Sequence, residues 1–194
     1  AKEIEGELKY AVRRQEETIY HRQLKMTSPA LNRFRDLVLY NLEAGQAVLT
    51  DNNDIRIYTD GKEKFHALIE EMKRAKKYIH VQYYIIRNDE VWQDIEKVLI
   101  EKAHEGVEVR VLFDSMGCRT MHKRDWDRLK REGIRVAEFF PAILGQLQMR
   151  VNYRNHRKIV VIDGKVGFVG GFNVGREYIG KDEKFGYWRD THLC

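Results

Sequence analysis

The stretch of sequence that decides the fold runs from YIHVQYYII at residues 78–86 to VEVRVLF at residues 107–113. The first run is rich in β-branched and aromatic residues, and the second alternates apolar and polar side chains, so both predict strands. Between them, apolar residues at helical spacing mark one face of a helix: Val91, Ile95, Val98, Leu99 and Ala103. Strand, helix and strand in this order predict an α/β domain with neighbouring parallel strands.

The same alternation continues on both sides of that stretch. Before it, residues 55–59 predict a short strand, Asp60-Gly61 a turn, and residues 65–75 a helix. After it, residues 126–140 predict a helix and then a strand, and Asp163-Gly164 joins two further strands as a hairpin. We therefore expect a mixed β-sheet flanked by helices. The aromatic residues expected in its core are Tyr83, Tyr84, Trp92 and Trp126.

The first 50 residues have a different pattern, dense in charge, with apolar residues at helical spacing at Ile4, Leu8, Ala11 and Val12. Ser28-Pro29 breaks this pattern, and a second short helix is predicted over residues 31–43. We predict an N-terminal helical appendage at residues 1–50 and a main domain at residues 51–194. The appendage is either a solvated unit that packs on the main domain or an interfacial helix beside a membrane.

Hydrophobic residues make up 43% of the 194-residue chain and charged residues 34%, which is the balance of a folded globular protein. The net charge of +5 is a mild excess that suits anionic lipid, nucleic acid or no anionic partner at all. Cys118 and Cys194 have no neighbours at zinc-ligand spacing and predict a reducing compartment. No run approaches the roughly 20 apolar residues that cross a bilayer, and the first residues do not form a signal peptide.

Residues suited to chemistry concentrate in NHRKIVVID at residues 155–163 and in GGFN at residues 170–173. Side chains two residues apart share one face of a strand, so His156 and Lys158 are expected to project together. An imidazole, with a pKa of about 6.5, is an uncharged nucleophile at neutral pH, and an ammonium holds phosphoryl oxygens as a point charge. The pair therefore predicts a phosphate site.

The hairpin predicts what lies opposite this pair. If Asp163-Gly164 is a two-residue turn, Val169 lies opposite Lys158 and Gly171 lies opposite His156. The glycines would then leave open space beside the imidazole, where a phosphate can approach. This register depends on the turn, because a bulge would shift it.

Two further polar residues belong to this constellation. Asn173 falls one step diagonally beyond His156, where its amide can donate to a phosphoryl oxygen. Asp163 does not share the strand face of His156 and Lys158. We expect its carboxylate to hold the turn or to orient a partner, and not to face the substrate directly.

The spacing His-x-Lys-x4-Asp, followed by Gly-Gly-x-Asn, resembles the signature of the phospholipase D superfamily. Further stretches similar to bacterial cardiolipin synthase lie at residues 78–86, 106–114, 152–158 and 187–192. The similarity covers residues 55–194 in outline. It implies a phospholipase D-like layered domain and makes residues 51–194 the catalytic half-domain.

The resemblance also implies a mechanism and the residues that perform it. His156 attacks phosphorus and forms a phosphohistidine. Lys158 and Asn173 bind the phosphate oxygens, and Asp163 is the supporting carboxylate. Donor and acceptor are both phosphatidylglycerol, and the products are cardiolipin and glycerol. No cofactor and no metal are implied.

The family's enzymes use two copies of the motif, whereas this chain has one. The second copy supplies a general acid for the leaving alcohol, a contribution of about 10²–10⁴-fold. The resemblance therefore implies a fragment whose second motif lies in a missing C-terminal half, or a chain whose two copies meet in a homodimer. Cardiolipin synthases also usually begin with membrane-spanning segments. This sequence shows none, which favours the fragment.

Three functions stay open at this point, and a cardiolipin synthase-type phosphatidyltransferase is the leading one. The alternatives are a phosphodiesterase, phospholipase or nuclease of the same superfamily acting as a homodimer, and an inactive lipid-binding half-domain. The expected partners are an anionic phospholipid and a membrane surface, at the cytoplasmic face of a bacterial cell membrane. No nucleic acid is expected.

A few other residues receive an expectation from pattern alone. The loop at residues 143–149 is apolar and either dips into a membrane or covers the core. His80 either reaches the site or is a hydrogen-bonded structural histidine. Arg189, Asp190 and His192 are expected to form structural pairs and are given no catalytic role.

Overall fold

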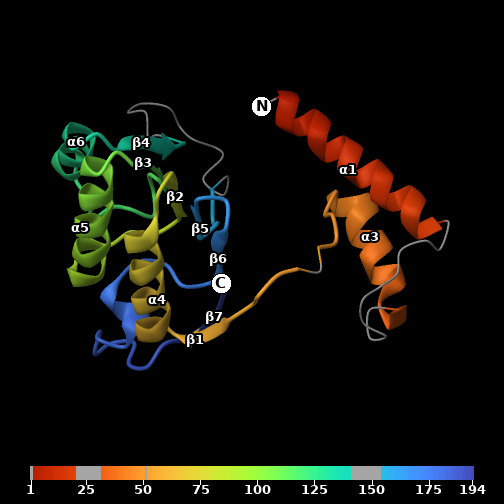
Figure 1. Ribbon diagram of the computed structural model, residues 1–194. Helices are drawn as coiled ribbons and strands as arrows, with labels where there is room; N and C mark the ends of the chain where they lie inside the picture. The colour runs from red at the N-terminus through yellow and green to blue at the C-terminus, as the bar shows by residue number, and fades with distance from the viewer. Residues whose placement is uncertain (1, 21–31, 51, 141–153) are drawn as a thin grey trace, which may run out of the picture. The chain divides into compact units, whose positions relative to one another are not determined.

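The structure is a computed structural model that describes residues 2–20, 32–50, 52–140 and 154–194. The chain divides into two compact units, Ala1–Asp54 and Ile55–Cys194 (Figure 1). The loop at residues 143–149 lies outside the described residues, so its two alternatives stay predictions.

The described residues of the first unit include the helices α1 (Lys2–Tyr20) and α3 (Arg35–Gly45). Val12 of α1 and Leu42 of α3 are buried in one small apolar cluster. The Gln15 side chain donates to the Leu49 carbonyl at 2.8 Å and accepts from the Leu49 N–H at 2.6 Å. The helical spacing of the first 50 residues thus corresponds to two helices that share a core of their own.

The second unit is built on a seven-stranded sheet with the strand order β1-β7-β6-β5-β2-β3-β4. Its strands are β1 (Ile57–Asp60), β2 (Tyr78–Tyr83), β3 (Glu108–Asp114), β4 (Arg135–Phe139), β5 (Ile159–Ile162), β6 (Val166–Gly170) and β7 (Arg189–Leu193). Strands β2, β3 and β4 are parallel neighbours, and the other neighbouring pairs are antiparallel. The predicted α/β class with a mixed sheet is confirmed.

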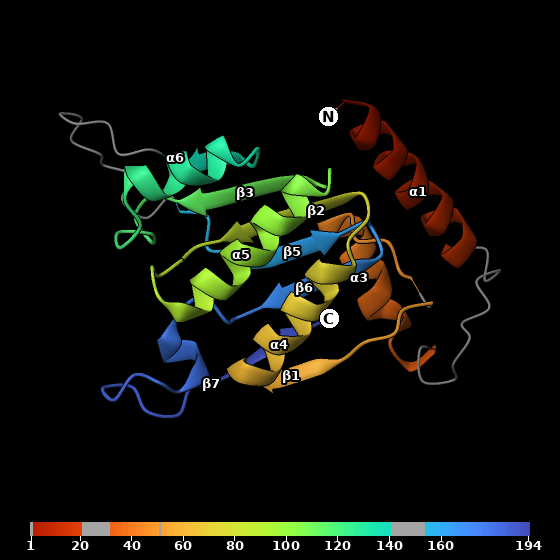
Figure 2. The ribbon, with the colours of Figure 1, turned by 60° about the vertical axis from the view of Figure 1, so that its left-hand side comes forward.

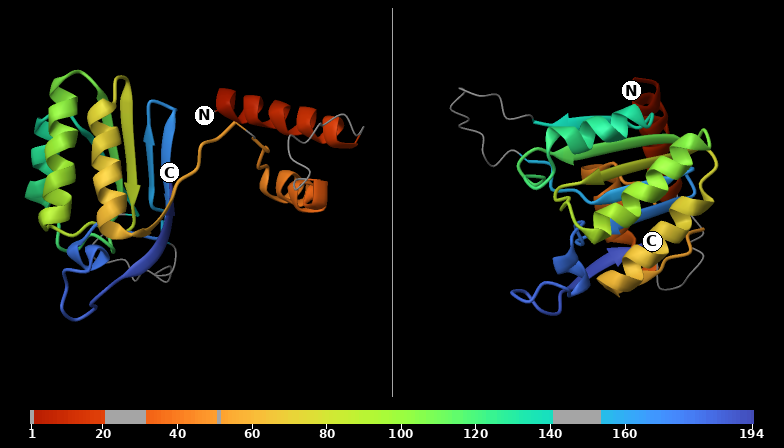
Figure 3. Two further views of the ribbon diagram at one scale, coloured as in Figure 1. Left: turned by 60° about the horizontal axis from the view of Figure 1, so that its bottom comes forward. Right: turned by 90° about the vertical axis from the view of Figure 1, so that its left-hand side faces the viewer.

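Three helices, α4 (Gly61–Arg74), α5 (Glu90–His104) and α6 (Lys123–Arg131), cover one face of this sheet (Figures 2 and 3). Asp60, predicted in a turn, is the N-cap of α4, because its Oδ1 accepts from the N–H groups of Lys62 and Glu63. The apolar face predicted for α5 is the face it buries. The alternation of helices and strands predicted from periodicity is therefore confirmed.

The core lies between the sheet and these helices. Tyr83 and Trp92 are 1% and 0% exposed, and Trp126 stacks on Phe113 with ring centroids 3.9 Å apart. Some side chains of β2, β3, β4 and β5 instead line a pocket of about 400 Å³. His80 lies in that pocket, with its Nε2 3.2 Å from Glu108 Oε1, so the structure supports the structural role for this histidine.

The strands β2 and β3 both end at one edge of the sheet. β2 stops at Tyr83, earlier than the predicted 78–86, and beyond it Ile86 forms only a single bridge to Val174. The loops that follow parallel strands meet at the carboxyl edge of a sheet, which is the usual place for a site in such folds. Residues 154–158 reach the same edge from the other direction, since β5 runs antiparallel to β2.

Candidate functional site

His156 and Lys158 lie together at this edge, just before β5 begins. The Lys158 Nζ is 2.7 Å from His156 Nδ1 and donates to the His156 carbonyl at 2.8 Å. His156 is exposed, whereas Lys158 is only 5% exposed. The predicted shared face is present, and it places a surface imidazole on a buried amine.

The surroundings of this pair act on the charge of both groups. The groups on which the His156 imidazole packs shield part of it from water and lower its pKa, the positive charge of Lys158 lowers this pKa further, and the carboxylate of Asp114 opposes both effects. Burial also lowers the pKa of Lys158, against an opposing effect of the Asp190 carboxylate. The imidazole is therefore uncharged at neutral pH, as a nucleophile must be.

Tyr84 is a third member of the site that the sequence placed in the core. Its ring centroid lies 4.3 Å from that of His156, and the Lys158 Nζ is 5.5 Å from the Tyr84 centroid. Tyr84 directly follows the last residue of β2, so it belongs to the carboxyl edge of the sheet and not to its interior. The aromatic ring fixes one side of the imidazole.

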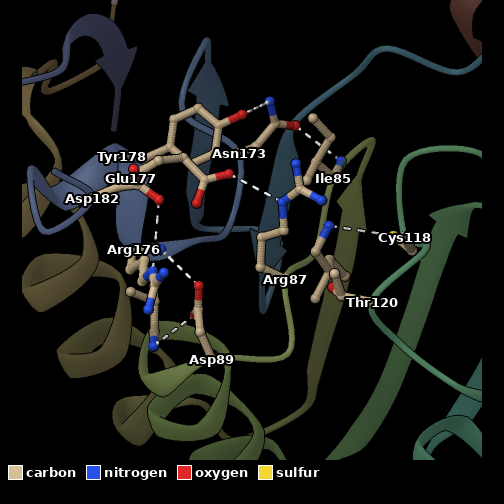
Figure 4. Close-up of polar contacts among 12 residues, drawn as sticks. Ile85, Arg87, Asp89, Cys118, Thr120, Asn173, Arg176, Glu177, Tyr178 and Asp182 are labelled. Carbon is tan, nitrogen blue, oxygen red and sulfur yellow. Dashed lines mark hydrogen bonds and ion pairs between the residues drawn. The ribbon is translucent and has the colours of Figure 1, made fainter. Parts of the chain in front are cut away.

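Asn173 is a buried link between the segment that follows β2 and a short helical turn that carries Tyr178 (Figure 4). It is 6% exposed, its Oδ1 accepts from the Ile85 N–H at 3.0 Å, and its Nδ2 donates to the Tyr178 hydroxyl at 3.0 Å. These two bonds orient the amide and use one of its two N–H groups. The sequence predicted an amide near His156, and did not predict that both ends of the amide are held.

The short helix η1 (Arg176–Ile179), which carries Tyr178, is itself tied to the loop after β2 (Figure 4). The Arg87 Nε donates to Glu177 Oε1 at 3.1 Å, and the Arg176 N–H donates to Asp89 Oδ2 at 2.7 Å. Burial raises the pKa of Asp89, and its backbone hydrogen bonds oppose that effect. The frame around Asn173 is thus built from one ion pair and one backbone-to-carboxylate hydrogen bond, each between residues distant in sequence.

The predicted hairpin is present, but its predicted register is wrong by one residue. Ile162 pairs with Val166 and Ile159 with Val169, so Val169 does not lie opposite Lys158. Asp163 and Gly164 have positive φ angles of 54° and 67°, and the turn closes from the Lys165 N–H to the Ile162 carbonyl. Lys165 is then an extra residue before the ladder, as in a bulge.

The two motif glycines also have another role than the one predicted. A Cβ at Gly171 would lie 1.9 Å from the Asp190 Oδ1, and a Cβ at Gly170 would lie 2.4 Å from the Thr191 carbonyl. The glycines therefore do not open space beside His156. They allow β7 to approach closely, and this approach brings the Asp190 carboxylate near Lys158.

Asp190 is consequently a site residue that the sequence did not assign. Two other polar residues of this strand lie in different surroundings. Arg189 is exposed, whereas His192 is fully buried near Phe172, with ring centroids 6.1 Å apart. Neither ring nitrogen of His192 has a hydrogen-bond partner among the described residues. Burial, with a smaller contribution from Lys64, lowers the pKa of His192 to about 3.

Asp163 lies away from this site. Its carboxylate accepts from the N–H groups of Lys76, Lys77 and Tyr78 at 2.8, 2.8 and 2.9 Å. Tyr78 is the first residue of β2, and His156 lies beyond the last, roughly 17 Å or more away at about 3.3 Å per residue. The structure thus places Asp163 in the turn, as its strand parity predicted, and does not bring it to His156.

A different carboxylate, Asp114 at the end of β3, supports the segment that carries His156. It is 1% exposed, its Oδ2 accepts from the Asn155 N–H at 3.1 Å, and its Oδ1 lies 3.7 Å from the Arg154 Nη1. A buried aspartate at the carboxyl end of a parallel strand is a signal that the sequence offered, in VLFD at residues 111–114.

No group of three or more His, Cys, Asp or Glu side chains that could hold a metal ion is found in the described part of the chain. Across residues 2–20, 32–50, 52–140 and 154–194, none of the helices has both the length and the apolar character needed to cross a membrane.

Comparison with known proteins places this arrangement in a family. Residues 68–184 match the family described as cardiolipin synthase, PLD-like domain. Cardiolipin synthase from Oceanobacillus iheyensis is 47% identical over 186 residues, which cover 96% of this chain and 39% of the relative. Cardiolipin synthase 2 from Staphylococcus epidermidis is 46% identical over 193 residues, covering 100% of this chain and 40% of the relative.

Among solved structures, phosphatidylserine synthase from Haemophilus influenzae superposes with a TM-score of 0.55 at 19% identity, covering 75% of this chain and 34% of that one. At that identity the likeness shows the fold alone, and it agrees with the phospholipase D-like layered domain that the motif implied. The chain spans 39–40% of the length of these two curated relatives, so it corresponds to part of such a protein.

Proposed function

The chain belongs to the family of cardiolipin synthase, PLD-like domains, and from this premise we propose that it is the nucleophile-bearing half of a phosphatidyltransferase. The reaction condenses two phosphatidylglycerol molecules to cardiolipin and glycerol. The observation that carries the proposal is the contact of a neutral, exposed imidazole with a buried amine, His156 on Lys158, at the carboxyl edge of the sheet.

In the first step, a ring nitrogen of His156 forms a bond to the phosphorus of one phosphatidylglycerol. The bond between phosphorus and the glycerol oxygen breaks, and that oxygen takes a proton from a general acid. In the second step, the free hydroxyl of another phosphatidylglycerol attacks phosphorus and the N–P bond breaks. The proton of that hydroxyl passes to the deprotonated general acid, which is thereby restored. Dividing one displacement into two lowers the barrier of each.

Lys158 and Asn173 have defined tasks in this scheme. An Nδ1 that accepts from Lys158 leaves the hydrogen on Nε2, and attack by Nε2 requires the other tautomer. A phosphate that draws the Lys158 amine onto its own oxygen releases Nδ1 and so favours the reactive form. The second amide hydrogen of Asn173 donates to another phosphoryl oxygen, and the held amide costs no reorganisation.

Asp190 completes the arrangement as a positioning residue. Its carboxylate lies near Lys158 and against Gly171, on the strand next to the motif hairpin. A negative charge there keeps the amine of Lys158 protonated in spite of its burial, and thus able to bind phosphate. Asp163, which shares the motif with His156, acts through the turn alone.

The general acid comes from a second copy of the motif, which we place in another part of the whole protein or in a second copy of this chain. The enzyme then works at a membrane surface, on the cytoplasmic face of a bacterial cell membrane. The presence of one motif in this chain favours a second candidate for the chain by itself, namely a half-domain that binds lipid headgroups without turnover.

The test is to incubate phosphatidylglycerol with this chain, alone and together with a polypeptide that bears the second motif. Cardiolipin and glycerol should appear in the complemented reaction, whereas phosphatidic acid and glycerol without cardiolipin would identify a hydrolase. His156→Ala should abolish product. The matched control is His80→Ala, because His80 is held by Glu108 in a different part of the sheet and should leave turnover unchanged.

Two results would contradict this assignment. Survival of activity in His156→Ala would exclude it as the nucleophile. Full activity of a strictly monomeric chain, established by its mass in solution, would contradict the need for a second motif.

A further inference from the structure

The segment between η1 and β7, residues 180–188, carries exposed aromatic side chains. Phe185 is 51% exposed and Tyr187 is 71% exposed. Figure 2 shows this segment as a loop that projects beside β7. Single exposed aromatic side chains are common on folded proteins, but several that stand together on one formed loop are typical of a surface that contacts something less polar than water.

This loop is closed on itself and tied to its surroundings. The N–H groups of Phe185 and Gly186 donate to the Asp182 carbonyl at 3.2 and 2.8 Å, and Gly186 has a positive φ of 62°. The Asp182 carboxylate lies 3.7 Å from the Arg176 Nε of η1. The tip, residues 184–187, is therefore a formed turn that presents its rings outward.

A row of contacts joins this tip to the proposed phosphate site. The Phe185 ring lies 5.7 Å from Trp188, and Trp188 lies 5.0 Å from Tyr178, both in edge-on geometry. The Tyr178 hydroxyl then accepts from the amide of Asn173 at 3.0 Å. The tip thus sits at a fixed position relative to the residue proposed to hold the phosphoryl oxygen.

The charges around the tip decide what kind of partner fits. The Lys184 Nζ lies 5.6 Å from the Phe185 ring, and Arg189 follows the aromatic residues as an exposed side chain. Of the acidic residues in the loop, Asp182 is matched by Arg176, and Glu183 is exposed. Aromatic rings bordered by cationic side chains are the composition that settles at the headgroup level of a bilayer.

We infer that the tip at residues 184–187 is a docking surface for an anionic lipid bilayer, with Phe185 and Tyr187 at the boundary of headgroups and acyl chains. The inference rests on the proposed function, since a lipid phosphate reaches the site only if the edge that carries Asn173 stands at the height of the headgroups. Lys184 and Arg189 add attraction to anionic headgroups.

The test uses the fluorescence of Trp188 in the whole chain. The other two tryptophans, Trp92 and Trp126, are 0% and 7% exposed, so quenching by brominated acyl chains reports on Trp188. Vesicles of brominated phosphatidylglycerol should quench it, and vesicles of brominated phosphatidylcholine should quench it less. Trp188→Phe should remove the signal and keep the binding measured by sedimentation with the vesicles.

The double variant Phe185→Ser, Tyr187→Ser should weaken vesicle sedimentation by at least about tenfold, the loss expected for two rings that no longer leave water. The matched control is Ile55→Ser, Ile57→Ser, which removes two exposed apolar side chains elsewhere on the second unit, 62% and 66% exposed, and should leave Trp188 quenching unchanged.

Equal sedimentation of the wild type and the Phe185, Tyr187 double variant would overturn the inference. So would a fall in the mass of the chain in solution on that substitution, because the tip would then be an interface between copies. Turnover of detergent-dispersed phosphatidylglycerol by the complemented enzyme without quenching would overturn the docking surface alone. Quenching without any cardiolipin from that enzyme would overturn the proposed function alone.

Discussion

Asp163 and Asp190 are two carboxylates at the two ends of the antiparallel half of one sheet, and their surroundings are opposite. Asp163 stands in the β5–β6 turn and holds three backbone N–H groups at the start of β2. Backbone hydrogen bonds, that of Tyr78 first, lower its pKa. Asp190 stands on β7, against Gly171 and near the amine of Lys158.

The difference shows that residues at a fixed spacing in a motif do not have to lie in the same site. His156 and Asp163 enclose a strand, so the constant interval between them is the length of β5 and its approach. One end of that interval reaches the carboxyl edge of the sheet and the other end caps a turn. The carboxylate that influences Lys158 comes from a different strand, and no local spacing marks it.

The largest expected effect is a loss of turnover when the charge of Asp190 is removed. Asp190→Asn keeps the size of the side chain and removes its charge, so Lys158 loses the group that favours its ammonium form. Cardiolipin formation by the complemented enzyme should fall by about 10²-fold, with little change in the unfolding midpoint. An activity within twofold of the wild type would leave Asp190 without a role at the site.

A second prediction tests the approach of β7 without touching a charge. Gly171→Ala places a Cβ where the Asp190 Oδ1 now lies, at 1.9 Å, so the carboxylate or the strand must move. Turnover should fall by about tenfold, a displacement of roughly 1 Å being sufficient for such losses. Gly167→Ala is the control on β6, the strand that Gly171 directly follows, because a Cβ there meets nothing within 4 Å.

The acid limb of the activity profile gives a third prediction. The pKa of His156 is lowered from the ordinary imidazole value of 6.5, so half-protonation of the ring occurs below pH 6.5. The fall of kcat/KM with acid should therefore be centred below that value. A limb centred above pH 6.5 would contradict the surroundings described for His156.

The smallest effects concern Asp163. Asp163→Asn should leave kcat within about twofold and lower the free energy of unfolding by about 1 kcal/mol, as for a lost cap that is partly exposed. Its folded pKa lies below the ordinary value of 3.8. The stabilisation is therefore complete above pH 3.8 and is lost as the pH falls through the lower folded pKa.

Urea unfolding of the wild type and Asp163→Asn between pH 2 and pH 7 measures this. The stability gap should narrow only at the acid end of that range. A fall in kcat well beyond twofold, with the small change in stability expected here, would instead give Asp163 a role at the site.

Much of the fold was accessible from the sequence because its signals are local. Alternation in VEVRVLF and the helical face of Val91 to Ala103 each depend on neighbours within one element, and both elements are present. The pairing of His156 with Lys158 was accessible for the same reason. Tyr84 was misplaced in the core because the end of β2 is set by the loop that follows it.

The register of the hairpin was not accessible, because one extra residue, Lys165, moves every partner on β6 by one position. The role of the glycines was likewise misread, since the strand that approaches them, β7, is far away in sequence.

By itself, then, the sequence determined the succession of strands and helices along the chain, the family, and the pairing of His156 with Lys158. Only the tertiary structure decided which carboxylate accompanies them and which one caps a turn. The physical reason is that strand periodicity acts between residues a few positions apart. The charge that acts on Lys158 is instead brought near by the packing of the whole sheet, and here it is Asp190 from β7, which is separated from β5 by β6.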